Sequence, residues 1–235
     1  MGATTKVEFA PGNLQYQAST NTARFAPNQY DVIGAANEAV SSTYTGWIDL
    51  FEWGKGDNLS YYNASATGGA SHKSFTDWGN NMPGTGNSWR TLSKGEWEYL
   101  YSKRPQANNL CGMANVNNIN GFIFLPDNFE KPSGISFSPG ATSFSVNTYT
   151  ISQWSQLQDA GAVFLPSGGC RTYQSATDPS PRVNMLNYGP RYWSSTPSDD
   201  AATAWYFGSN QDDGTRMFTT YRSYGNSVRL VKNIP

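Results

Sequence analysis

Few residues of this 235-residue chain have the type and spacing of a catalytic or metal-binding set. Two cysteines, Cys111 and Cys170, lie far apart, so the sequence is compatible with either one disulfide or two buried thiols. The chain has no Cys-x-x-Cys pair and one histidine, His72, so a zinc site of the Cys/His type is not expected. The Gly-rich segment 83–86 lacks the Lys-Ser/Thr ending of a phosphate-binding loop. We therefore expect neither a catalytic site nor a cofactor.

Two pairs of carboxylates, Asp199 with Asp200 and Asp212 with Asp213, could offer oxygen ligands to a hard cation. Such pairs more often occupy turns, where the side chains accept hydrogen bonds from nearby backbone N–H groups. We expect the turn role and no functional metal here. A structural calcium ion elsewhere in the chain stays open.

Recognition is the second chemistry that residue type and spacing suggest, in segment 191–231. Trp205 and Phe207 alternate with Tyr206, Gly208 and Asn210, so the two sets point to opposite faces of a strand. After the turn at Asp212-Asp213-Gly214, a second strand would place three residues on the Tyr206 face: Arg216, Phe218 and Thr220. Rigid aromatic rings among small polar groups are typical of a binding surface. The alternative is that these are ordinary scattered surface aromatics.

The scaffold that positions this segment contains two predicted helices with capping boxes. In the first, the Ser93 hydroxyl is expected to accept from the Glu96 N–H, while the Glu96 carboxylate accepts from the Ser93 N–H. Pro105 ends this helix, whose inward face carries Trp97, Leu100 and Tyr101. In the second, Thr150 and Gln153 form the box, and the helix runs to Gly161 with Trp154 and Leu157 inside.

Short apolar runs bounded by turn residues predict strands elsewhere, at 7–16, 24–25, 30–34, 121–126 and 162–166. The apolar spacing of Trp47–Gly54 favours a further short helix. Strands and helices do not alternate, and no repeat or linker divides the chain. We therefore predict an α+β fold in a single compact domain, residues 1–235, with two main short helices, many short strands and long irregular loops.

The composition limits the partners. The net charge of -1 gives no electrostatic footprint for nucleic acid. No apolar run approaches the roughly 18 residues of a membrane helix, so membrane insertion is not expected. Residues 1–6 lack the apolar region of a signal peptide, so the chain either stays where it is made or is a domain of a longer exported protein.

Two groups of residues resemble a known family. The segment WRTLSKGEWEY at 89–99 resembles the helix segment of formylglycine-generating-enzyme-like domains, a branch of the C-type lectin fold. The pieces YWSST at 192–196, Ala204-Trp205 and GNSVRLV at 225–231 resemble the ending of a bacterial group. This group includes surface and lipoprotein domains and the variable proteins of diversity-generating retroelements, which display hypervariable ligand-binding residues on a C-type lectin scaffold.

The resemblance implies core strands at 193–196, 205–207 and 228–231, and a variable-type ligand-binding region at about 192–231. It implies that the chain is a receptor- or adhesin-type binding module on a bacterial cell surface or phage particle, with a protein or glycan surface as ligand. The oligomeric state stays unknown. The ligand-binding residues implied by the resemblance and the alternation are Ser198, Asp199, Asp200, Thr203, Tyr206, Gly208, Asn210, Asp212, Asp213, Arg216, Phe218, Thr220, Tyr221, Ser223, Tyr224 and Asn226.

Two alternative functions remain. One is a structural surface or fimbrial domain without a diversified site. The other is an oxidase of the formylglycine-generating type, which the resemblance disfavours because that chemistry uses a close cysteine pair near the end of the domain. A calcium-dependent lectin would carry Glu-Pro-Asn or Gln-Pro-Asp with Trp-Asn-Asp, and neither occurs. Arg222 and Arg229 are expected to tie irregular loops to backbone carbonyls.

Overall fold

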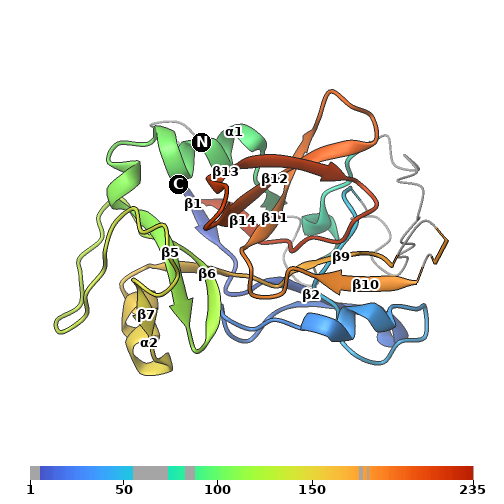
Figure 1. Ribbon diagram of the computed structural model, residues 1–235, viewed down its shortest axis with the longest axis horizontal. Coiled ribbons are helices and arrows are strands. Elements are labelled where there is room, and N and C mark those ends of the chain that lie inside the picture. The colour runs from blue at the N-terminus through green and yellow to red at the C-terminus, as the bar shows by residue number, and fades with distance from the viewer. Residues whose placement is uncertain (1–5, 55–73, 83–87, 175–176, 179, 235) are drawn as a thin grey trace.

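The computed structural model describes residues 6–54, 74–82, 88–174, 177–178 and 180–234 (Figure 1). The strands are β1 (Lys6–Phe9), β2 (Leu14–Gln17), β3 (Thr22–Phe25), β4 (Trp89–Thr91), β5 (Cys111–Val116), β6 (Ile119–Phe124), β7 (Thr148–Tyr149), β8 (Val163–Pro166), β9 (Cys170–Tyr173), β10 (Pro181–Asn184), β11 (Arg191–Pro197), β12 (Thr203–Asn210), β13 (Gly214–Tyr221) and β14 (Leu230–Ile234). The helices are α1 (Lys94–Glu98), α2 (Ile151–Asp159), the π-helical turn η4 (Tyr99–Lys103) and the 3-10 turns η1 (Ala18–Thr20), η2 (Gly34–Ala39), η3 (Trp78–Asn81) and η5 (Ala107–Asn109).

The strands of the described residues form five small sheets. Their orders are β1-β14-β4, β10-β9, β11-β12-β13, β2-β3 and β7-β5-β6-β8. Pairing is antiparallel except between β5 and β7. The first and last strands, β1 and β14, lie side by side (Figure 1). The α+β class with few short helices and several small sheets is therefore confirmed.

Both predicted capping boxes are present. The Ser93 N–H donates to Glu96 Oε2 at 2.8 Å, and Ser93 Oγ accepts from the Glu96 N–H at 3.3 Å. Arg90 adds two bonds to the Glu96 carboxylate, at 3.0 and 2.7 Å. Burial alone would raise the pKa of Glu96, but the hydrogen bonds from Arg90 and Ser93 outweigh it and lower the pKa to about 2. This carboxylate therefore fixes the start of α1 against β4.

The second box holds the start of α2. Thr150 and Gln153 exchange the same pair of bonds, at 2.9 and 3.3 Å. The helix buries Trp154 and Leu157, and the chain leaves it through Gly161 at a φ of 90°, a conformation open to glycine. The helix and its inner face are therefore as the sequence predicts.

Most predicted strands are also present. The runs at 121–126 and 162–166 correspond to β6 and β8, and 24–25 lies in β3. The alternating run at 7–16 is divided by Pro11 and Gly12 into β1 and β2. The core strands implied at 193–196 and 205–207 lie in β11 and β12, whereas the last strand begins at Leu230, later than implied.

Two predictions are wrong. Trp47–Gly54 is not a helix but an extended, irregular segment, in which Ile48 bridges Tyr16 and Phe51 bridges Asn226. Its backbone groups bond to distant segments, so the apolar spacing reflects burial between neighbours and not a helical face. Residues 30–34 form no strand, because the chain turns there into η2.

Buried arginines hold the irregular segments together, as predicted for Arg222 and Arg229. Arg229 donates to the carbonyls of Ala10 (3.0 Å) and Phe164 (2.6 Å), and Arg222 donates to the carbonyl of Thr203 (2.8 Å). Arg171, fully buried, does the same for Asn37 and Leu50. These bonds give buried backbone carbonyls of irregular segments and strand ends a hydrogen-bond donor.

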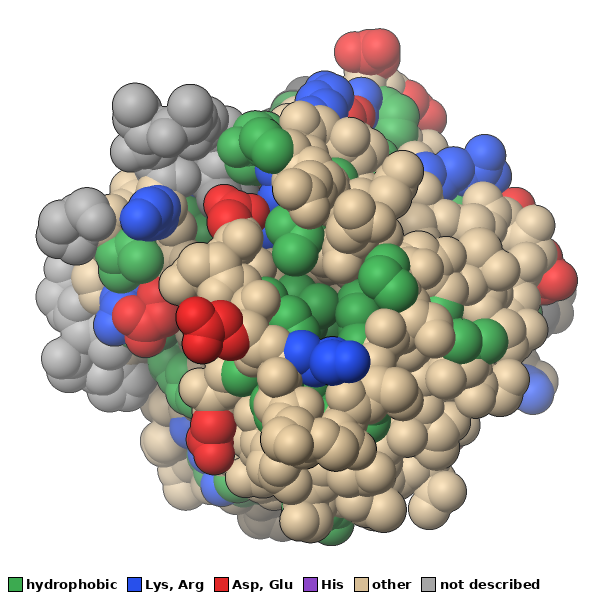
Figure 2. Space-filling view, turned by 90° about the vertical axis from the view of Figure 1, so that its left-hand side faces the viewer, with side chains coloured by type: hydrophobic (Ala, Val, Ile, Leu, Met, Phe, Trp, Pro, Cys, Tyr) green, Lys and Arg blue, Asp and Glu red, His purple; other side chains and the backbone are tan. Residues whose placement is uncertain are grey.

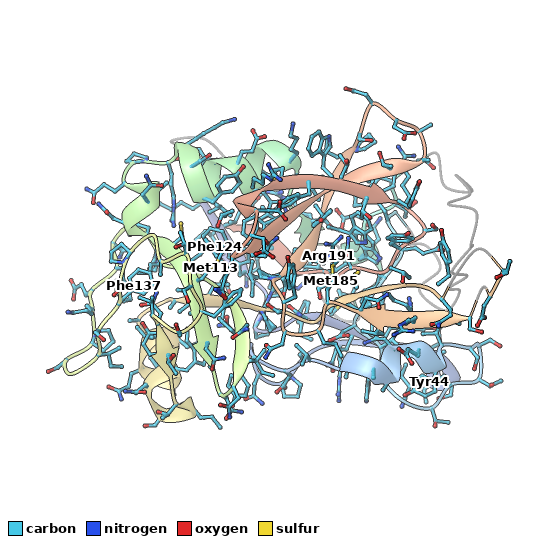
Figure 3. The ribbon with its side chains drawn as sticks, in the orientation of Figure 1. Tyr44, Met113, Phe124, Phe137, Met185 and Arg191 are labelled. Carbon is cyan, nitrogen blue, oxygen red and sulfur yellow. The ribbon has the colours of Figure 1, made fainter. Side chains whose placement is uncertain are left out.

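The interior has three apolar clusters of described residues. One lies between α1 and the β11-β12-β13 sheet and includes Trp97, Phe207 and Met217, together with Met113 and Phe124, which Figure 3 labels on the β5-β6 side. A second surrounds Trp53, Trp78, Trp193 and Tyr206, and a third lies under α2. No described helix is both long and apolar enough to cross a membrane.

Candidate functional site

The predicted binding residues lie along the β12-β13 hairpin and the segment that follows it. In the register, Tyr206 pairs with Phe218, Gly208 with Arg216 and Ala204 with Thr220. These residues therefore share one face of the hairpin. Phe207 and Met217 pair on the opposite face and belong to the core under α1. The grouping of these residues into two opposite faces is therefore as alternation predicts.

Two aromatic rings and two guanidinium groups are stacked on the Tyr206 face. The ring of Tyr206 stacks on that of Phe218, with centroids 5.5 Å apart and an interplanar angle of 20°. The Arg191 guanidinium carbon lies 4.2 Å from the Tyr206 centroid, and that of Arg216 lies 4.5 Å from the Phe218 centroid. We call Arg191, Tyr206, Phe218 and Arg216 the aromatic–arginine face. Cation–π contacts of this kind hold rings in fixed positions.

Gly208 makes this stacking possible. A Cβ at this position would lie 2.9 Å from the Phe218 ring, closer than such contacts occur. The missing side chain allows the ring to lie over the strand, with Tyr206 beside it. Gly208 therefore shapes the surface, and its backbone is covered by its neighbours.

Four residues predicted to face outward are buried: Tyr206, Gly208, Ser223 and Asn226. Tyr206 is 6% exposed, because Phe218 and Arg191 flank it and Trp193 meets it edge-on at 6.3 Å. Asn226 is fully buried, because its backbone pairs with Phe51 in both directions. The expected free surface is corrected at these four positions.

The other predicted residues are accessible to solvent. Six are exposed: Asp199, Asp200, Asp212, Asp213, Arg216 and Tyr221. Six more are partly exposed: Ser198, Thr203, Asn210, Phe218, Thr220 and Tyr224. A surface that a ligand can touch therefore remains around Phe218 and along the outer part of the hairpin.

The aspartates have roles in turns. Asp200 accepts from the Ala202 N–H at 2.9 Å, and Asp213 forms an ion pair with Arg216 at 3.2 Å. The Asp212–Asp213 turn is closed by Asn210, whose side-chain oxygen accepts from both aspartate N–H groups. In the described part of the chain, no three His, Cys, Asp or Glu residues group closely enough to hold a metal ion. His72 lies outside the described residues.

Both cysteines are free and buried, which settles the alternative that the sequence left open. Burial raises the pKa of the Cys111 thiol to about 11 and also raises that of Cys170. Cys170 is the first residue of β9. Thiols with raised pKa values are weak nucleophiles at neutral pH.

Sequence reasoning missed several exposed apolar residues that adjoin the aromatic–arginine face. Met185, Leu186 and Tyr188 lie between β10 and β11 and are 49%, 44% and 42% exposed. Arg191 donates to Met185 Sδ at 3.6 Å, and Figure 3 shows the two side chains next to each other. The Tyr188 hydroxyl donates to Asp212. Three apolar residues within a four-residue turn region were the signal that could have revealed them.

A tyrosine cluster extends the surface from β13 towards β9. The Tyr221 and Tyr224 centroids are 5.4 Å apart, and those of Tyr224 and Tyr173 are 6.1 Å apart.

Between the aromatic–arginine face and Tyr188 lies a crevice of about 10 Å³, which holds no more than roughly one water molecule. The site is therefore a shallow surface.

No protein-family model, curated protein or solved structure matches this chain.

Proposed function

We propose that the chain is a ligand-binding module with a C-type lectin-like scaffold, whose site is the aromatic–arginine face together with the tyrosine cluster. The stack of Arg191, Tyr206, Phe218 and Arg216 is the observation that carries the proposal. Tyrosine and arginine are the residues that most often dominate binding energy at interfaces. Because the rings are already held in place, little conformational entropy is lost when a ligand binds.

The ligand is a protein or glycan surface. A crevice of about 10 Å³ excludes a buried small molecule, which needs a cavity of roughly 300 Å³ or more. The net charge of -1 predicts that affinity falls only modestly with salt, since few charges steer association. Two buried thiols with raised pKa values support binding over the alternative of a thiol-dependent oxidase.

A binding measurement tests the site. The chain would be multimerised on beads and applied to arrays of purified glycans and proteins. The double variant Arg216→Ala with Tyr221→Ala should lose binding to any feature that the unmodified chain recognises. The matched control is Val146→Ala with Ile151→Ala, two exposed apolar residues elsewhere on the surface, 53% and 49% exposed. If both double variants bind equally, the site is elsewhere.

We further propose that the face belongs to a variable protein of a diversity-generating retroelement, displayed on a bacterial surface or phage particle. The gene would then lie beside a reverse transcriptase gene and an adenine-rich near-copy of its own 3′ end. Among natural copies, substitutions should gather at accessible positions such as Asn210, Arg216 and Thr220. Copies that vary equally at Trp193 and Phe207, which are buried, would contradict this part of the proposal.

One observation favours a structural surface domain as a second candidate. Four residues of the predicted binding segment are buried in the interior: Tyr206, Gly208, Ser223 and Asn226. The segment therefore contributes to the packing of the core, whether or not it also binds a ligand. A structural domain would bind nothing on the arrays. A binding module would bind a ligand, and it would lose this binding in the double variant Arg216→Ala with Tyr221→Ala but not in the control variant.

A further inference from the structure

A cleft of about 840 Å³ lies away from the aromatic–arginine face, between β1, η4 and the end of β6. All four residues of β1, Lys6–Phe9, line it. A strand that turns one of its faces towards a cavity lines that cavity with every second residue. Because four consecutive residues of β1 line the cleft, β1 turns its edge towards it. Its apolar lining includes Leu100, Phe124 and Pro126. Figure 2 shows the side of the molecule where β7 and α2 lie, with hydrophobic side chains gathered at a hollow near the middle.

The free edge of β1 presents unpaired backbone groups. The Ala10 N–H donates to the Leu230 carbonyl on β14. Glu8 and Lys6, two and four residues earlier, point their backbone groups the same way and lie opposite Lys232 and Ile234. In an antiparallel pair, the residues between these turn their N–H and C=O away from the partner strand. Those residues are Val7 and Phe9, whose backbone groups have no hydrogen-bond partner among the described residues on the cleft side.

On the other side of the same cleft, the backbone groups at the outer edge of β8 have hydrogen-bond partners. On β8, the side-chain amide of Gln29 accepts from the Phe164 N–H at 2.7 Å and donates to the Ala162 carbonyl at 3.5 Å. The Phe164 carbonyl accepts from Arg229 at 2.6 Å. Thus β8 is covered by side chains that imitate a neighbouring strand, whereas β1 is not.

We propose that the β1 edge binds an extended segment of a partner polypeptide as an added strand. The outward N–H and C=O groups of Val7 and Phe9, two residues apart, match the hydrogen-bond spacing of the backbone of another strand. Side chains at alternate positions of that segment would enter the cleft and contact Leu100 and Phe124, so we expect them to be apolar. Three charged residues of the lining, Glu8, Arg104 and Asp127, are already paired within the chain. Glu8 pairs with Lys232 (3.1 Å) and Arg104 with Asp127 (3.2 Å), which favours uncharged side chains there.

A displayed library of random peptides of about nine residues, long enough to pair along β1, is the probe. Val7→Pro removes the outward N–H and keeps the ladder to β14, because proline is tolerated at a strand edge. Val7→Ala is the matched control, which shortens the same side chain but keeps the N–H. We expect selected peptides with alternating apolar residues, whose affinity falls about tenfold or more in Val7→Pro and little in Val7→Ala. An unenriched library, or peptides that bind both variants equally, would overturn the proposal.

Amide hydrogen exchange on the unmodified chain tests the edge without any substitution. The Val7 and Phe9 amides should exchange rapidly in the free protein and become protected when a selected peptide is bound. Protection at Phe218 or Tyr221 instead would assign the peptide to the aromatic–arginine face and overturn the proposal. So would a concentration-dependent dimer abolished by Val7→Pro, because a second copy would then occupy the edge. Arg216→Ala with Tyr221→Ala should leave peptide affinity unchanged, so this proposal and the proposed function can fail separately.

Discussion

The two faces of the β12-β13 hairpin are both packed, but by different means. On one face, Phe207 stacks on Trp97 with centroids 5.0 Å apart and an interplanar angle of 16°, inside a closed apolar cluster under α1. On the other, Tyr206 stacks on Phe218 and is flanked by an arginine. The first face is covered by α1 around Phe207 and Met217. The second is covered only where other segments reach it.

The cover of the second face ends within a few residues. Near Trp193, the segment that contains Phe51 and Trp53 lies against β11, where Trp53 Nε1 donates to the Ser194 carbonyl and Trp193 Nε1 to the Phe51 carbonyl. Two residues further along the hairpin from Phe218, Arg216 is exposed. One face of one hairpin therefore contains both a core and a surface. Within the aromatic–arginine face, we propose that the ligand contacts the accessible side chains of Phe218 and Arg216.

The largest effect is expected from the helix-covered face. Phe207→Ala should lower the free energy of unfolding by about 3–5 kcal/mol, because it leaves a cavity beside Trp97. Urea denaturation followed by tryptophan fluorescence measures this. Thr219→Ala is the control, since Thr219 is exposed on a neighbouring strand. A loss no larger than that of the control would show that the packing under α1 is not rigid.

Tyr206→Ala tests whether the second face is a core at this position. We expect a loss of about 2–3 kcal/mol, because the ring is buried between Phe218 and Arg191. Tyr206→Phe keeps the ring and should cost much less in the same denaturation experiment. If Tyr206→Ala were neutral, the Tyr206 ring would belong to the free surface. The Phe207 face of the hairpin would then be core and the whole Tyr206 face would be surface.

Acid should weaken the attachment of the helix that covers the first face. The pKa of Glu96 is lowered to about 2 from its usual value of 4.5, so its stabilisation is complete above pH 4.5 and is lost as the pH falls towards 2. We expect about 1–2 kcal/mol, since water partly screens the pair with Arg90. Unfolding measured between pH 7 and pH 3 should show a smaller acid loss in Glu96→Gln. Equal slopes would contradict the role of the Arg90–Glu96 pair.

The smallest effects are expected at the outer part of the second face. Arg216→Ala and Thr220→Ala should each change the unfolding free energy by within about 0.5 kcal/mol, because solvent already contacts these side chains. Differential scanning calorimetry of the two variants provides the measurement. A loss comparable to that of Tyr206→Ala would mean that the cover extends over the whole face.

Local sequence signals determined much of the scaffold. The capping boxes at Ser93 and Thr150 could be predicted because each bond joins residues three positions apart. The turn at Asp212–Gly214 and the separation of Tyr206 from Phe207 follow from local geometry in the same way. The roles of Arg222 and Arg229 could be predicted because irregular backbone needs donors for its carbonyls.

Tertiary structure alone decided what covers each face. Alternation shows which side chains point the same way, but Asn226 is buried where it pairs with Phe51, a residue far away in the sequence. The same is true of Trp47–Gly54, where long-range bridges replaced the predicted helix. The covered edge of β8 and the open edge of β1 depend on where Gln29 and Arg229 lie in the folded chain. A periodic pattern fixes the direction of a side chain, whereas its burial depends on which distant segment packs against it.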